Sequence, residues 1–160
     1  MRAVLSTGSN MEDSRAHLAA VVRAFRPHLI RASSLYATAP WGGIDQPDFL
    51  NQALLIDVPL TPHELLATCQ SLEREANRVR DVRWGPRTLD VDIVDIEGVT
   101  SDDPTLTIPH PRAHQREFVL RPWLEIDPDA TLNGQPVADI LAALEPQGVR
   151  KLYDAPGDLP

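Results

Sequence analysis

Two aspartates, Asp90 and Asp92, lie two residues apart in a segment that alternates apolar and acidic side chains. This alternation predicts a strand at residues 89–96, with both carboxylates on one face and Val91 and Ile93 on the other. Carboxylates about 6–7 Å apart along a strand suit two Mg²⁺ ions that bridge phosphate oxygens. In the alternative interpretation, both aspartates form the solvated face of an edge strand.

An arginine-rich segment comes directly before these aspartates. Its five arginines face only two acidic residues, Glu75 and Asp81. The arginines are Arg74, Arg78, Arg80, Arg83 and Arg87. The planar guanidinium suits bidentate phosphate contacts, so the cluster indicates a small polyanionic ligand. A solvated helix end held by salt bridges would carry the same charges.

Cation ligands and phosphate-binding arginines in one short segment favour phosphoryl transfer, where catalysis consists mostly of positioning and charge neutralisation. The turn at residues 7–10, Thr-Gly-Ser-Asn, lacks the Gly-Lys-Ser/Thr ending of a Walker loop. Any ATP site would therefore be built from arginines and metal ions.

The elements that must position these groups fit one domain over residues 1–160. Periodicity and turn signals predict strands at 2–6, 29–38, 49–58, 89–96 and 149–153, with a short extended piece at 105–108. They predict helices at 13–25, 62–77, 115–124 and 137–144, and loops at 39–48, 78–86 and 97–104. This order predicts an α+β fold, a ferredoxin-like antiparallel sheet with helices packed against it, which names no function by itself.

Composition sets further bounds on the class of protein. The net charge of −8 argues against nucleic-acid binding, and no apolar run is long enough to cross a membrane. The single cysteine, Cys69, excludes an internal disulfide and is expected to be a core thiol. The start of the chain lacks a signal-peptide pattern, so we expect a cytoplasmic protein, and we expect a monomer.

Several segments of the sequence together resemble a known protein family. A twelve-residue string at 83–94 is similar to the hallmark of the 6-hydroxymethyl-7,8-dihydropterin pyrophosphokinases, and it reads Arg-Trp-Gly-Pro-Arg-Thr-Leu-Asp-Val-Asp-Ile-Val. Further matches follow in the family's order at residues 5–10, 38–51 and 106–111. The resemblance runs from about residue 3 to residue 130. It implies transfer of pyrophosphate from ATP to the pterin in folate biosynthesis, with magnesium.

The resemblance also implies roles for particular residues. Asp90 and Asp92 would hold two Mg²⁺ ions, and Arg78 and Arg87 would act with them in catalysis. The implied ATP-binding residues are Gln70, Glu73, Arg80, Trp84, Arg87, Ile93, Thr107, His110 and Arg116. The implied pterin-binding residues are Thr38, Ala39, Trp41, Phe49, Asn51 and Phe118.

These pterin assignments also make physical sense, because aromatic faces can hold a flat heterocycle between them and an amide can both donate to and accept from its edge. Phe49 and Phe118 could equally be core residues. Either aspartate could accept the hydroxyl proton, or the metal ions alone could lower its pKa. The alternative function is a non-catalytic ferredoxin-like module that binds pterin or nucleotide.

Overall fold

A computed structural model describes residues 1–10, 13–39, 48–77 and 89–152. An antiparallel sheet forms its middle layer, made of β1 (Arg2–Ser9), β2 (Leu29–Ala32), β3 (Tyr36–Thr38), β4 (Phe49–Asp57), β5 (Asp90–Ile96) and β10 (Val149–Lys151). The helices are α1 (Ser14–Phe25), α2 (Pro62–Asn77), α3 (Glu117–Ile126) and α4 (Val137–Ala143), with short 3-10 helices η1 (Arg26–His28) and η3 (Ala113–Gln115). Two small hairpins pair β6 (Ser101–Asp103) with β7 (Leu106–Ile108), and β8 (Thr131–Leu132) with β9 (Gln135–Pro136).

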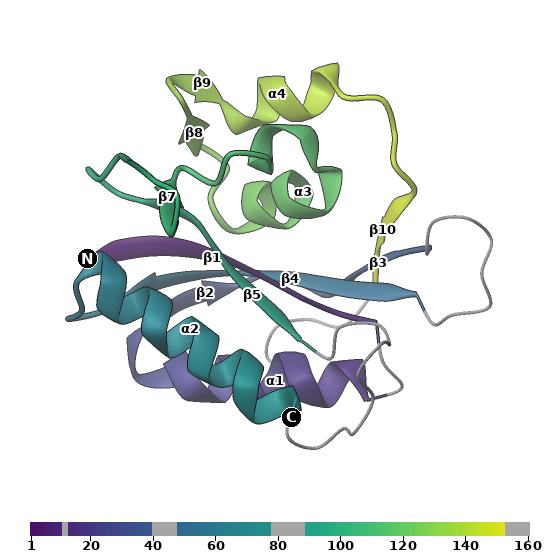
Figure 1. Ribbon diagram of the computed structural model, residues 1–160. Helices are drawn as coiled ribbons and strands as arrows, with labels where there is room; N and C mark the ends of the chain where they lie inside the picture. Colours follow the sequence, from purple (N-terminus) through teal and green to yellow (C-terminus); the bar gives the residue numbers. More distant parts are fainter. Residues whose placement is uncertain (11–12, 40–47, 78–88, 153–160) are drawn as a thin grey trace.

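The strand order is β10-β3-β4-β1-β5, and β2 also pairs with β4. Helices α1 and α2 cover one face of the sheet, and α3 and α4 lie over the other (Figure 1). The prediction of a ferredoxin-like antiparallel sheet is thereby confirmed.

Helix α2 begins where the sequence predicts. Thr61 and Glu64 form a capping box, in which Glu64 Oε1 accepts from the Thr61 backbone at 2.9 Å and Thr61 Oγ1 accepts from the Glu64 backbone at 3.2 Å. Leu65 and Cys69 lie on the buried face of this helix. The core-thiol prediction for Cys69 is confirmed, and burial raises its pKa to about 12.

Strand β5 alternates between the two faces of the sheet. Val91 and Ile93 belong to the apolar core against α1 and α2, whereas Val94 belongs to the core under α3. The pairing of β5 with β1 shifts register next to Leu5, which marks a β-bulge. Asp90 and Asp92 therefore project toward the α3 side, as the alternation predicts.

The predicted single strand at 29–38 is wrong, because β2 and β3 are separate. Ala32 lies opposite Leu54 and Tyr36 opposite Asn51, so four steps on one strand match three on the other. The Ser33 side chain causes part of this break, since its Oγ accepts from the Ala53 backbone at 2.9 Å.

Three further expectations need correction. Strand β1, expected to end at residue 6 before a turn at 7–10, continues to Ser9 and pairs with β4 along this length. The segment 97–104, expected to be a loop, contains strand β6, which pairs with β7. The β8–β9 hairpin was not expected, although its turn residues Asn133 and Gly134 both have positive φ, the geometry of a two-residue hairpin turn.

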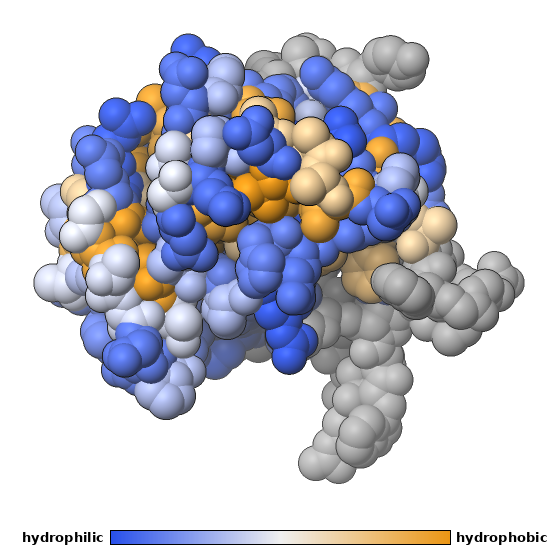
Figure 2. Space-filling view, turned by 90° about the horizontal axis from the view of Figure 1, so that it is seen from above, coloured by the Kyte–Doolittle hydropathy of each residue, from blue (hydrophilic) through white to orange (hydrophobic). Residues whose placement is uncertain are grey.

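Most of the predicted loop at 39–48 and all of the arginine-rich loop at 78–86 lie outside the described residues. Seen from the α3–α4 side, the surface mixes hydrophilic residues with small apolar patches (Figure 2). Within the described ranges, no helix combines the length and apolar character needed to cross a membrane.

Candidate active site

A cavity of about 410 Å³ opens on the α3 side of the sheet. This volume lies within the range of roughly 300–1,000 Å³ that ligand pockets occupy. Among the described residues, its lining comes from Ser6, Thr7, Gly8, Thr38, Ala39, Phe49, Asn51, Asp90, Asp92, Arg116 and Phe118. Eight of these eleven residues were implied by the family resemblance, so distant parts of the sequence meet in one place.

The register of the sheet fixes the floor of this cavity. On β1, Gly8 lies between Asn51 of β4 and Asp90 of β5, and Ser6 lies next to Asp92. Opposed residues of antiparallel strands face the same side. The two carboxylates therefore stand along one edge of the floor, with the Asn51 amide across β1 from them.

The rest of the cavity lining combines aromatic rings with polar groups. Phe49 comes from β4 and Phe118 from the first turn of α3, and the Arg116 guanidinium lies 5.5 Å from the centre of the Phe118 ring, within cation–π range. The Asn51 side chain is buried, and its Nδ2 donates to the Thr7 carbonyl at 3.3 Å. Thr38 Oγ1 is buried with no hydrogen-bond partner among the described residues, so a ligand could satisfy it.

Two other predicted residues lie along the outer edge of β5 instead of on the cavity floor. Glu73 of α2 accepts from the Val91 backbone at 2.9 Å. The His110 backbone donates to the Val94 carbonyl at 2.8 Å, and burial lowers the pKa of the His110 ring despite the nearby charge of Asp92. Strand β5 thus separates the cavity on the sheet face from a second group of predicted ligand contacts at the sheet edge.

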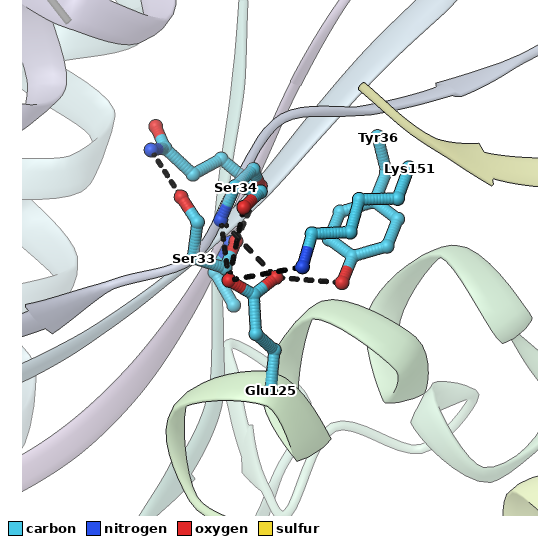
Figure 3. A network of polar contacts seen from close by, with 7 residues as sticks. Ser33, Ser34, Tyr36, Glu125 and Lys151 are labelled. Atoms are coloured by element: carbon cyan, nitrogen blue, oxygen red, sulfur yellow. Dashed lines mark hydrogen bonds and ion pairs between the residues drawn. The ribbon is translucent and has the colours of Figure 1, made fainter. Parts of the chain in front are cut away.

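A polar network ties α3 to the strand that carries Thr38 (Figure 3). The Glu125 carboxylate accepts from the Ser34 backbone and hydroxyl at 3.0–3.2 Å and from the Tyr36 hydroxyl at 2.6 Å. Lys151 of β10 adds an ion pair at 4.0 Å. Burial and the bond to Glu125 raise the pKa of Tyr36, so its hydroxyl stays a donor at neutral pH. The network fixes β3 against the helix that carries Phe118.

Three more predicted residues lie within the described ranges but do not line the cavity. Gln70 is exposed on α2, and the Thr107 hydroxyl donates to the Asp103 carbonyl at 3.0 Å. The Ile93 side chain is buried in the core against α1 and α2, so it can meet a ligand only through its backbone. The residues that lie outside the described ranges are Trp41, Arg78, Arg80, Trp84 and Arg87.

Sequence reasoning assigned no site role to Ser6, Thr7 or Gly8, although all three line the cavity. The available signal was a run of small polar residues in an otherwise apolar central strand. Such residues are poor choices for a packed core.

The fold and the cavity define a ferredoxin-like α+β protein that can hold a small ligand on one sheet face, beside two carboxylates. Residues 4–128 match the family described as 7,8-dihydro-6-hydroxymethylpterin-pyrophosphokinase (HPPK). The chain belongs to this family.

Curated relatives carry one common name, 2-amino-4-hydroxy-6-hydroxymethyldihydropteridine pyrophosphokinase. The protein from Methylorubrum extorquens is 44% identical over 94% of this chain and 98% of its own length. The one from Mycobacterium tuberculosis is 45% identical over 91% of this chain and 85% of its own. The one from Pseudomonas aeruginosa is 38% identical over 96% and 98%.

Among solved structures, HPPK-DHPS of Plasmodium falciparum superposes with a TM-score of 0.68 at 14% identity. The match covers 88% of this chain but 45% of that one, so this chain spans less than half its length. At this identity the likeness shows the fold alone.

Proposed function

We propose that this protein transfers pyrophosphate from ATP to 6-hydroxymethyl-7,8-dihydropterin with the help of Mg²⁺, giving AMP and the pterin pyrophosphate in folate biosynthesis. The family and the names of relatives at 38–45% identity support this reaction. The observation that carries the proposal for the site is the cavity, which joins an aromatic and amide wall to two carboxylates.

The pterin would occupy the sheet-face cavity. Phe49 and Phe118 offer aromatic faces for a flat heterocycle. Asn51 and the Thr38 hydroxyl, which has no hydrogen-bond partner among the described residues, offer hydrogen bonds to its edge. Ala39 and Trp41 would complete this binding site.

The carboxylates of Asp90 and Asp92 fit Mg²⁺. Both line the same cavity, and the described residues contain no larger group of His, Cys, Asp or Glu side chains that could hold a metal. Mg²⁺ suits such a pair because it commonly takes one or two carboxylates and completes its shell with water and phosphate oxygens. When bound, two such ions would offset the charge of the phosphates.

The nucleotide would lie along the edge of β5 and reach the cavity through its phosphates. The side chains of Arg78 and Arg87 would grip the triphosphate through bidentate contacts. The other proposed ATP-binding residues are Gln70, Glu73, Arg80, Trp84, Ile93, Thr107, His110 and Arg116. His110 suits a phosphate contact, since its neighbours Arg112 and Arg116 add positive charge.

The reaction would form one bond and break another. The pterin hydroxymethyl oxygen bonds to the β-phosphorus of ATP, and the bond from that phosphorus to the oxygen of AMP breaks. Asp90 or Asp92 can accept the proton that the hydroxymethyl group releases, since both carboxylates face the cavity. The aromatic walls orient the pterin and exclude water from the transferred group.

A direct assay tests this proposal. AMP released from ATP would be measured with and without 6-hydroxymethyl-7,8-dihydropterin, in Mg²⁺ and after chelation. We expect AMP only when pterin and Mg²⁺ are both present. Pterin-independent AMP release, or binding of both ligands without turnover, would contradict it, and the second result would favour the non-catalytic alternative.

We further propose that the protein acts as a monomer in the cytoplasm on small molecules alone. Size-exclusion chromatography with light scattering tests the monomer, and cell fractionation tests the location.

A further inference from the structure

Gly8 occupies the middle of the cavity floor. It is buried on the central strand β1, with Asn51 of β4 on one side and Asp90 of β5 on the other. Two neighbouring-strand spacings separate Asn51 from Asp90, about 10 Å in all. Gly8 itself therefore adds no side chain to the floor between these two residues.

The backbone conformation of Gly8 does not require glycine. Gly8 is not among the described residues with positive φ, so an alanine would fit its backbone without strain. In an ordinary strand, alanine would even be favoured, because glycine loses more conformational freedom on folding.

The space beside Gly8 leaves no room for a side chain while the Asn51 carboxamide keeps its position. A Cβ at this position would stand 2.7 Å from Asn51 Nδ2, closer than real Cβ atoms approach other heavy atoms. Its next contacts, Leu50 O at 3.7 Å and Asn51 Cγ at 3.9 Å, are ordinary. The clash is therefore with the carboxamide of Asn51 and with no other described group.

We propose that Gly8 is a positioning residue for pterin recognition, an inference that rests on the proposed function. Its missing side chain lets the Asn51 carboxamide lie across β1, where Nδ2 donates to the Thr7 carbonyl at 3.3 Å. That bond orients the amide in the cavity. A methyl group at position 8 pushes the amide out of this position.

The effect should be selective for one substrate. Asn51 lies on the cavity floor, whereas Glu73 and His110 contact the outer edge of β5 through Val91 and Val94. A methyl group at Gly8 reaches none of these edge contacts. Pterin binding should therefore weaken while nucleotide binding does not.

Calorimetric titration of the full chain tests this, with 6-hydroxymethylpterin in one series and a non-hydrolysable ATP analogue with Mg²⁺ in the other. We expect Gly8→Ala to weaken pterin binding by about tenfold, as overpacking of a filled site does, and to leave nucleotide affinity unchanged. The KM for pterin should rise more than kcat falls. In an Asn51→Ala background, where the clashing amide is gone, Gly8→Ala should weaken pterin binding no further.

Unchanged pterin affinity in Gly8→Ala, equal losses for both ligands, or a full additional loss in the double variant would each overturn the inference. If Gly8→Ala fails to fold, the double variant with Asn51→Ala shows whether the clash with the Asn51 amide is the cause. Recovery of the fold supports the clash with Asn51, and a second failure overturns it. The parent protein serves as the control for the underlying function, because pterin binding and pterin-dependent AMP release by the parent do not depend on the role of Gly8.

Discussion

The two faces of the central sheet use the same strands for different purposes. Toward α1 and α2, strands β1, β4 and β5 present Leu5, Leu54, Val91 and Ile93 to a closed apolar core. Toward α3, the same strands present apolar residues only in part, and their other residues line the cavity.

The difference shows which residues serve stability and which serve binding. Buried apolar side chains on the α1–α2 face contribute to folding in proportion to the area they bury. Ser6 and Asn51 on the other face are also buried, although a buried polar side chain contributes less to stability than a buried apolar one. Both residues line the cavity, where their polar atoms are available to a bound ligand.

The largest expected effect comes from neighbouring residues of β5. Asp90→Ala and Asp92→Ala should each lower turnover by on the order of a thousandfold and leave the melting temperature nearly unchanged. Val91→Ala, between them but on the other face, should keep turnover and lower the free energy of unfolding by about 2 kcal/mol. Steady-state kinetics and urea unfolding on all three variants check this contrast. Near-parent turnover in either aspartate variant would refute the metal-binding assignment.

A second contrast uses adjacent amides of β4. Asn51→Ala should weaken pterin binding by on the order of a hundredfold while nucleotide affinity stays the same, as calorimetry would measure. Gln52→Ala is the matched control. The Gln52 amide donates to the Ser33 carbonyl at 2.8 Å and does not line the cavity, so its loss should reduce stability and spare pterin affinity. Equal effects on both ligands in Asn51→Ala would make Asn51 a structural residue.

A smaller effect is expected from Glu125, which acts at a distance from the ligand. Glu125→Ala leaves the Ser34 backbone and the Tyr36 hydroxyl without their partner, which should cost on the order of 2 kcal/mol of stability. Looser contact between β3 and α3 should raise the KM for pterin a few-fold with little change in kcat. Tyr36→Phe, which removes one bond of the network, is expected to fall between the parent and Glu125→Ala. Unchanged KM and stability in Glu125→Ala would rule out this anchoring role.

The smallest effect concerns Asp95, at the other end of β5, beside a hollow of about 220 Å³ that includes Trp123. Burial raises its pKa above 3.8. A carboxyl with a raised pKa stabilises the fold while protonated, and this contribution is lost as the pH rises through the raised value. Asp95→Asn should therefore melt higher than the parent at neutral pH, and the gain should shrink as the pH falls toward 3.8. Calorimetry across this range checks it, with the exposed Asp102→Asn as control. A gain that does not vary with pH would contradict the burial argument.

Much of this arrangement could be predicted because it depends on local patterns. The capping box at Thr61 and Glu64 fixes the start of α2, and the alternation along β5 assigns Asp90 and Asp92 to one face. The break between β2 and β3 depends on the Ser33 side chain and on Glu125, which is distant in sequence. The role of Gly8 depends on an Asn51 amide on the next strand, so no local pattern reveals it.

The most direct test of the central claim, that the α3-side cavity binds the pterin, is a crystal structure with 6-hydroxymethylpterin, Mg²⁺ and a non-hydrolysable ATP analogue. We expect the heterocycle between Phe49 and Phe118, its polar edge on Asn51 and its hydroxymethyl group toward Asp90 and Asp92. A heterocycle bound elsewhere, for example in the hollow beside Trp123, would contradict it.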